Sequence, residues 1–149
     1  MKVYKIADVA FSLKTVYSYT QEMLADYLYD GESNFLIETT IADIKKEKEN
    51  APEFPDNYLE SLAVYRKLCE KLLSSYDAFL FHGSALAVDG KAYIFTAPSG
   101  TGKSTHAKMW GELLGDKVVV INDDKPIIRF IDGDFYVYGT MPPSLFWWQ

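Results

Sequence analysis

Between residues 97 and 104 the chain reads Ala97-Pro98-Ser99-Gly100-Thr101-Gly102-Lys103-Ser104, and this stretch decides which fold to expect. It fits the phosphate-binding pattern G-x-x-x-x-G-K-[ST], with alanine at the first glycine. Small residues let successive backbone N–H groups converge on phosphate oxygens, while a lysine reaches the β- and γ-phosphates and a hydroxyl holds Mg²⁺. The pattern therefore predicts a loop that binds ATP together with Mg²⁺.

The segments on either side of this loop favour the same interpretation. An apolar strand at Ala92–Phe95 leads into it, and a helical pattern at Ser104–Leu114 follows it. The phosphates would then lie at a helix N-terminus, where unpaired N–H groups and the helix dipole attract anions. The residues expected to contact the nucleotide are Ala97, Pro98, Ser99, Gly100, Thr101, Gly102, Lys103, Ser104 and Thr105, with the Ser104 hydroxyl also expected on the metal.

Two adjacent carboxylates, Asp123 and Asp124, follow the next apolar strand, Val118–Ile121. A buried strand that delivers a carboxylate beside a phosphate loop completes the coordination of Mg²⁺ in such proteins. One aspartate can bind the metal, directly or through water, while the other accepts the proton of an attacking hydroxyl. The structural alternative is a turn capped by aspartate before Pro126. The phosphate loop nearby favours the functional interpretation.

The two histidines invite different interpretations. His82 lies within an apolar strand that precedes the loop, and from spacing alone a structural role is favoured there. His106 falls in the first turn of the loop helix, where we expect it to face solvent or the neighbouring strand, and it is assigned no role. Cys69 lies on the apolar face of a helix, which favours core packing over reactivity because nothing electropositive accompanies it.

The remaining pattern divides the chain into an N-terminal subdomain, residues 1–55, and a second half, residues 56–149. In the first, the apolar pattern predicts strands within Lys2–Lys14 and Asn34–Thr39, and a capped helix that runs from Thr20 to Gly31. Residues 41–50 form a polar stretch, expected as a solvated helix or loop. The second half begins with a helix capped by Asp56.

Most of the second half is rich in strands. Asp89-Gly90 and Asp132-Gly133 are hairpin turn signals, because such turns need positive φ. They predict antiparallel pairs between Phe79–Val88 and Lys91–Thr96, and between Ile127–Ile131 and Phe135–Tyr138. The order of elements in this half, two strands, a helix and three further strands, predicts an α/β fold with a mixed sheet.

Composition excludes several classes of protein. The chain has 15 Lys and Arg residues against 21 Asp and Glu, a net charge of −6, which argues against a nucleic-acid partner. No run approaches ~18 apolar residues and no signal sequence is recognisable, so we expect a cytoplasmic protein without a membrane partner. A single cysteine excludes an intramolecular disulfide.

Three motifs together resemble the HPr kinase/phosphorylase and phosphoenolpyruvate carboxykinase superfamily. They are His82–Ala85, Ala97–Ser104 and Asn122–Asp124, and the likeness spans Phe81–Tyr138. A hairpin that leads into the phosphate loop is also similar to that superfamily. The catalytic histidine of HPr kinase precedes the loop lysine by the interval that separates His82 from Lys103 (103 − 82 = 21). The resemblance implies a mixed-sheet P-loop fold with a small N-terminal α+β subdomain.

The resemblance also implies an activity and a set of roles. The activity would be ATP-dependent transfer of a phosphoryl group to a hydroxyl of a protein or small molecule. The implied catalytic residues are His82, Lys103 as the phosphate clamp, and Asp124 as the base. Ser104 and Asp123 are the implied metal ligands.

The C-terminal part departs from the family pattern. Relatives continue past this point into a further carboxylate and basic residues, whereas this chain ends at Gln149. We therefore expect the acceptor site to be absent or supplied by another chain, and the alternative function is a non-catalytic nucleotide-binding or regulatory relative. The apolar tail predicts a homo-oligomer, most simply a two-fold dimer through Tyr138–Gln149; the alternative is a tail folded back onto the helix Asp56–Ser75.

Overall fold

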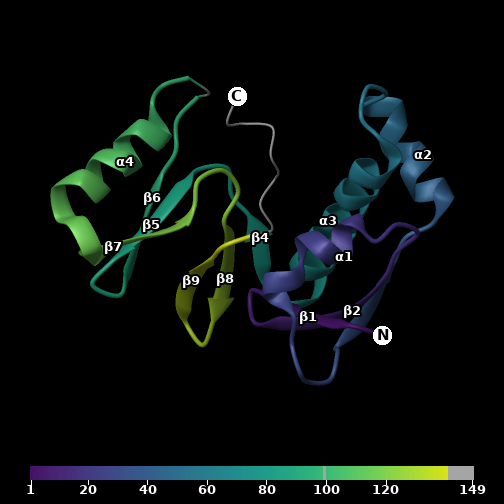
Figure 1. The fold of residues 1–149 in the computed structure, drawn as a ribbon. Helices are drawn as coiled ribbons and strands as arrows, with labels where there is room; N and C mark the ends of the chain where they lie inside the picture. The colour runs from purple at the N-terminus through teal and green to yellow at the C-terminus, as the bar shows by residue number, and fades with distance from the viewer. Residues whose placement is uncertain (99, 141–149) are drawn as a thin grey trace. The chain divides into compact units, whose positions relative to one another are not determined.

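A computed structural model of the chain describes residues 1–98 and 100–140 (Figure 1). The chain divides into two units, Met1–Leu72 and Leu73–Gln149. At a coarse level the fold is α/β, with small sheets and four α-helices in the described ranges. No helix within these ranges combines the length and apolarity needed to cross a membrane.

A three-stranded sheet organises the first unit. It contains β1 (Val3–Ile6), β2 (Val9–Lys14) and β3 (Phe35–Glu38), in the order β1-β2-β3. The first pair is antiparallel and the second is parallel, so this sheet is mixed. The strands predicted within Lys2–Lys14 and Asn34–Thr39 are confirmed. Buried side chains from these strands and from the helices form the core of this unit. Large ones among them are Tyr4, Ile6, Phe11, Leu24, Ile44, Leu59 and Leu68.

Four helical segments begin in the first unit: α1 (Tyr19–Met23), a 3₁₀ turn η1 (Ala25–Tyr27), α2 (Ile41–Asn50) and α3 (Asp56–Ser75). Helix α2 begins with a capping box, in which Thr40 and Asp43 satisfy each other's backbone N–H groups. The single capped helix predicted from Thr20 to Gly31 is wrong. Ser18 is the N-cap and makes no side-chain cap bond, and a helix this short without a cap lacks the support to propagate.

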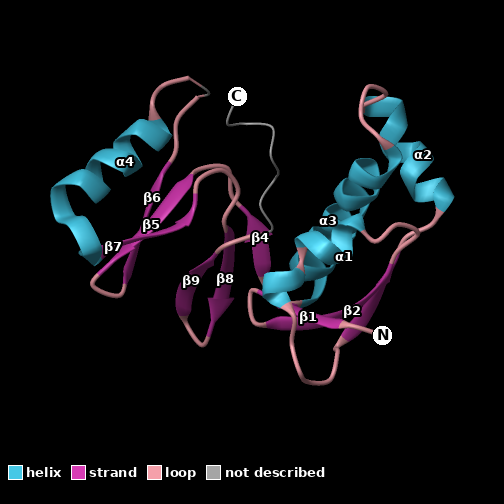
Figure 2. Ribbon diagram, in the orientation of Figure 1, coloured by secondary structure: helices cyan, strands magenta, loops and turns pink. Residues whose placement is uncertain are grey.

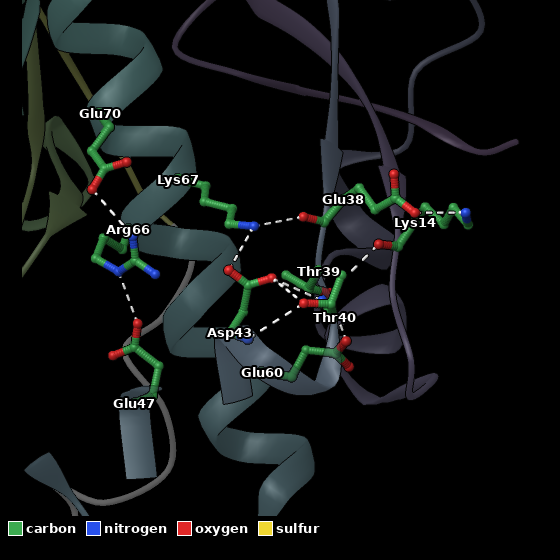
Figure 3. A network of polar contacts seen from close by, with 10 residues as sticks. All are labelled: Lys14, Glu38, Thr39, Thr40, Asp43, Glu47, Glu60, Arg66, Lys67 and Glu70. Atoms are coloured by element: carbon green, nitrogen blue, oxygen red, sulfur yellow. Dashed lines mark hydrogen bonds and ion pairs between the residues drawn. The ribbon is translucent and has the colours of Figure 1, made fainter. Parts of the chain in front are cut away.

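The division between the units lies within α3, later in the chain than the boundary expected before Asp56. The reason is that hydrogen bonds and an ion pair connect α3 to the N-terminal elements (Figure 3). The buried carboxylate of Glu60 accepts a hydrogen bond from the Thr39 hydroxyl, and the Lys67 ammonium donates to the Glu38 carbonyl. Arg66 is paired with Glu47 of α2 at 2.8 Å.

The second unit contains two separate three-stranded sheets (Figure 2). One has the order β4-β8-β9 and the other β6-β5-β7, and all the pairs within them are antiparallel among the described residues. Their strands are β4 (Ala78–Leu80), β5 (Ser84–Val88), β6 (Lys91–Phe95), β7 (Val118–Asn122), β8 (Ile127–Ile131) and β9 (Asp134–Tyr138).

Both predicted hairpins are confirmed, but the mixed sheet expected in this half is not formed by the described residues. Asp89-Gly90 and Asp132-Gly133 adopt positive φ and join β5 to β6 and β8 to β9. Two-residue turns of this kind fold a chain directly back on itself, which makes neighbouring strands antiparallel. The one parallel pair in the described ranges, β2 with β3, lies in the first unit.

Helix α4 (Lys103–Leu114), followed by a 3₁₀ turn η2 (Gly115–Lys117), packs along the sheet β6-β5-β7 and contacts β5 and β7 (Figure 1). Strand β7 was expected to be buried, and this is wrong for the described residues. Val119 and Val120 are 62% and 61% exposed, because β7 lies at one edge of the sheet and α4 covers only part of it.

The predicted association through residues 138–149 concerns a segment that lies mostly outside the described residues. Tyr138 ends β9, and Thr140 is buried. Residues 141–149 are not described, so both the dimer and the alternative of a folded-back tail stay predictions.

Candidate functional site

The predicted phosphate loop lies between β6 and α4, as the sequence pattern indicates. Gly100 and Gly102 have φ of +81° and +96°, a backbone conformation that other residues rarely adopt. Gly102 is the N-cap of α4, and the Thr101 amide and hydroxyl both donate to the Pro98 carbonyl. The described loop residues from Gly100 to Gly102 are exposed, so the helix N-terminus is open to solvent. Ser99 lies outside the described residues.

Lys103, the expected phosphate clamp, has a partner within the loop. Its Nζ donates to the carbonyl oxygen of Ala97 at 3.0 Å, and the side chain is half-buried. The Lys103 side chain therefore spans the loop from its last residues back to its first. Ser104 and Thr105 follow in the first turn of α4, and both are exposed.

His82 lies in the connection between β4 and β5, not within a strand as predicted. The cause is the neighbouring Gly83, whose N–H donates to the Asp124 carbonyl at 2.9 Å in place of a regular strand pairing. A Cβ on Gly83 would lie 2.7 Å from the Phe95 carbonyl oxygen, so only glycine fits there. Thr96 donates its hydroxyl to the His82 carbonyl at 3.3 Å. These contacts hold the His82 segment between the start of the loop and the aspartates.

The His82 side chain faces the second aspartate. Its Nε2 lies 3.5 Å from Asp124 Oδ1, and the Lys125 ammonium lies 4.0 Å from Asp124 Oδ2. Asp124 is half-buried whereas His82 is exposed, so a ligand can approach the pair from solvent. A carboxylate that a ligand can reach is a group able to accept a proton from a bound hydroxyl.

Asp123 has a different environment. It is exposed, and its Oδ1 accepts a hydrogen bond of 2.6 Å from Ser84 at the start of β5. The Asp123 carboxylate and the Ser104 hydroxyl are hard oxygen ligands, which fit Mg²⁺ because this ion takes one or two protein oxygens and completes its shell with phosphates and water. Among the described residues, no group of three or more His, Cys, Asp and Glu side chains could hold a metal ion.

Asn122 builds the turn that presents the aspartates. Its Oδ1 accepts hydrogen bonds from the backbone N–H groups of Asp124, at 2.9 Å, and Lys125, at 2.7 Å. Its Nδ2 donates to the Thr140 hydroxyl at 3.0 Å, and Thr140 is buried. The turn is thus organised by asparagine, not by an aspartate cap as in the structural alternative. The Asp123 carboxylate instead bonds to Ser84, and the Asp124 carboxylate lies beside His82.

Sequence reasoning missed Ser84, Thr96 and Asn122 as positioning residues. Of the three, only Asn122 could have been predicted from the sequence, because the side chain of an asparagine at the end of a strand commonly bonds to the backbone two residues on. Ser84 and Thr96 act through contacts to Asp123 and His82, 39 and 14 residues away in the chain. No local pattern reports such contacts.

Comparison of the chain with protein-family models, with curated proteins and with solved structures gives no match. The resemblance drawn from the three motifs therefore stays a prediction, together with the roles that it implies. The site stands on its own geometry: a glycine loop at a helix N-terminus, and the histidine and aspartate beside the start of that loop.

Proposed function

We propose that the chain binds ATP with Mg²⁺ at residues 97–105 and transfers the γ-phosphoryl group to a hydroxyl of a protein or small molecule, as HPr-kinase-like enzymes do. The observation that carries the proposal is the 3.5 Å contact between His82 Nε2 and Asp124 Oδ1. This contact brings together two motifs that are 42 residues apart in the chain (124 − 82 = 42). The hydrogen bond from the Thr96 hydroxyl to the His82 carbonyl links His82 to the start of the phosphate loop.

Nucleotide binding is supported by the open end of α4. The first N–H groups of a helix have no partner within the helix, and Gly100 and Gly102 let the backbone approach phosphate oxygens closely. Lys103 donates to the Ala97 carbonyl and would also donate to a phosphate oxygen, which is a stronger partner because it carries negative charge. Ser104 and Asp123 would hold Mg²⁺, which supplies positive charge to the phosphates.

The chemistry proposed for Asp124 is that of a general base. The acceptor hydroxyl oxygen forms a bond to the γ-phosphorus, the bond from that phosphorus to the leaving oxygen of ADP breaks, and the hydroxyl proton passes to the Asp124 carboxylate. His82 acts through Asp124, because it lies beside one carboxylate oxygen while Lys125 lies near the other. His82 is thus a positioning residue in this scheme.

A second candidate is a nucleotide-binding protein that does not turn ATP over. The bond from Ser84 to Asp123 favours it, because this carboxylate already serves to fasten the turn to β5. The two candidates share the nucleotide and differ in the fate of the γ-phosphate.

Thermal unfolding with nucleotide tests the shared part. At a ligand concentration about 100 times Kd, binding stabilises the folded state by about 2.7 kcal/mol, which raises the Tm by several degrees. We expect this rise with MgATP. An unchanged Tm at millimolar MgATP contradicts both candidates. Transfer of ³²P from labelled ATP to protein, small molecule or water then separates the enzyme from the binding protein.

A further inference from the structure

Four aromatic side chains gather beside the phosphate loop, between β6 and the first turns of α4. Tyr93 and Phe95 come from β6, and His106 and Trp110 come from α4. The ring centroids of Phe95 and His106 are 4.7 Å apart, those of Phe95 and Trp110 5.5 Å, and those of Tyr93 and Trp110 5.0 Å. The sequence assigned no role to any of them.

Trp110 holds the side chain of His106 in its orientation. Its indole Nε1–H donates to His106 Nε2 at 3.3 Å. The planes of His106 and Phe95 meet at 85°, an edge-to-face contact that does not bury both faces of the imidazole. His106 is correspondingly exposed.

His106 stands close to the loop. Its backbone N–H donates to Gly102, the N-cap of α4, at 2.8 Å, so it lies one turn into the helix. Side chains on a helix lean toward its N-terminus, which directs the imidazole toward the loop. Phe95, on the other side of the cluster, ends the strand that leads into the same loop.

We propose that the exposed imidazole of His106 is the platform on which the base of the bound nucleotide stacks. This inference rests on the function proposed above, because it requires the phosphates at the N-terminus of α4. Stacking on an aromatic ring suits every base, since each has a π-face. The ligand class is therefore nucleoside triphosphates in general, with ATP and GTP bound alike. The contacts from Trp110 and Phe95 hold the ring in place before the nucleotide arrives.

The competing explanation is that the cluster only packs α4 onto the edge strand β6. A ligand with phosphates and no base separates the two explanations. We compare MgATP, MgGTP and magnesium tripolyphosphate by calorimetry, using the intact chain and three variants. His106→Gln keeps an acceptor for Trp110 without an aromatic face, and His106→Phe keeps the face without the acceptor. Met109→Ala alters an exposed residue of the same helix as a control.

For His106→Gln we expect binding of both nucleotides to weaken about tenfold and binding of tripolyphosphate to stay within about twofold. His106→Phe is expected to retain nucleotide affinity, and Met109→Ala to change nothing. Equal losses for nucleotides and tripolyphosphate in His106→Gln would overturn the platform, because the residue would then act on the loop. Unchanged affinities would overturn it as well. If the unmodified chain binds none of the three ligands, the proposed function is contradicted, and the platform with it.

Discussion

The hydroxyl of Thr39 donates a 2.6 Å hydrogen bond to the carboxylate of Glu60, which is fully buried in α3 (Figure 3). The same carboxylate accepts from the backbone N–H groups of Val16, at 2.6 Å, and Tyr17, at 2.9 Å. Three donors thus compensate for the lost hydration of the charge. One side chain joins α3 to the segment after β2 and to the end of β3.

Replacing this carboxylate should be costly for the first unit. In Glu60→Gln the amide NH₂ group replaces one of the two acceptor oxygens, so at least one donor loses its partner in the buried site. We expect a loss of about 3 kcal/mol in the free energy of unfolding, measured by urea denaturation. Glu49→Gln, at an exposed position of α2, is the control and should change stability by less than about 0.5 kcal/mol. Similar values for both variants would show that the three bonds contribute little.

Lys103→Ala tests the phosphate loop. The variant loses the charge that would pair with the phosphates, so most of the rise in Tm with MgATP should disappear. Lys108→Ala removes an equal charge from an exposed position on the same helix, and its response to MgATP should match that of the unmodified chain. Equal shifts in both variants would exclude Lys103 as the phosphate clamp.

Asp124→Asn separates catalysis from binding. A general base contributes about 10²–10⁴-fold to rate and little to the affinity for ATP. We therefore expect phosphoryl transfer to fall by that factor while the Tm rise with MgATP persists. Asp116→Asn, at an exposed position in η2, is the matched control. If Asp124→Asn transfers phosphate at the full rate, the proton has another acceptor.

Alkaline pH should destabilise the first unit through Tyr4. Burial raises the pKa of its phenol above the ordinary value of 10.0. A raised pKa in the folded state means that the contribution to stability is complete below the unfolded value and is lost as the pH rises through the folded value. Tyr27 adds to the same loss, because burial and then the charge of Asp26 raise its pKa. Urea denaturation between pH 8 and about 11 measures the effect.

Tyr4→Phe should reduce this alkaline loss without a cost at neutral pH. The Tyr4 hydroxyl is buried and has no hydrogen-bond partner among the described residues, so its removal takes away an unsatisfied group. We expect neutral-pH stability to be unchanged or higher. Tyr136→Phe, at an exposed position of β9, should leave the pH dependence as it is. A large loss of stability in Tyr4→Phe at pH 7 would contradict this account.

The parts of the fold that local chemistry dictates could be predicted from the sequence. Asp89-Gly90 and Asp132-Gly133 fix their hairpins because the turns need positive φ, and Gly102-Lys103 marks where α4 begins. The arrangement of the strands into two sheets could not be predicted, because it depends on pairing between distant segments such as β4 and β8. The pattern also could not place His82 outside a strand, since the tight approach of Gly83 to Phe95 decides that.

The bond from Lys103 to Ala97 orients the ammonium group before any ligand reaches the loop. An ammonium has three N–H donors, so the 3.0 Å bond to the Ala97 carbonyl leaves two of them for a further partner. Under the proposed function that partner would be a phosphate oxygen, whose negative charge would bind the ammonium more strongly than the partial charge of a neutral sugar or amide. The loop would then favour ligands of high charge density without breaking the contact that orients its lysine.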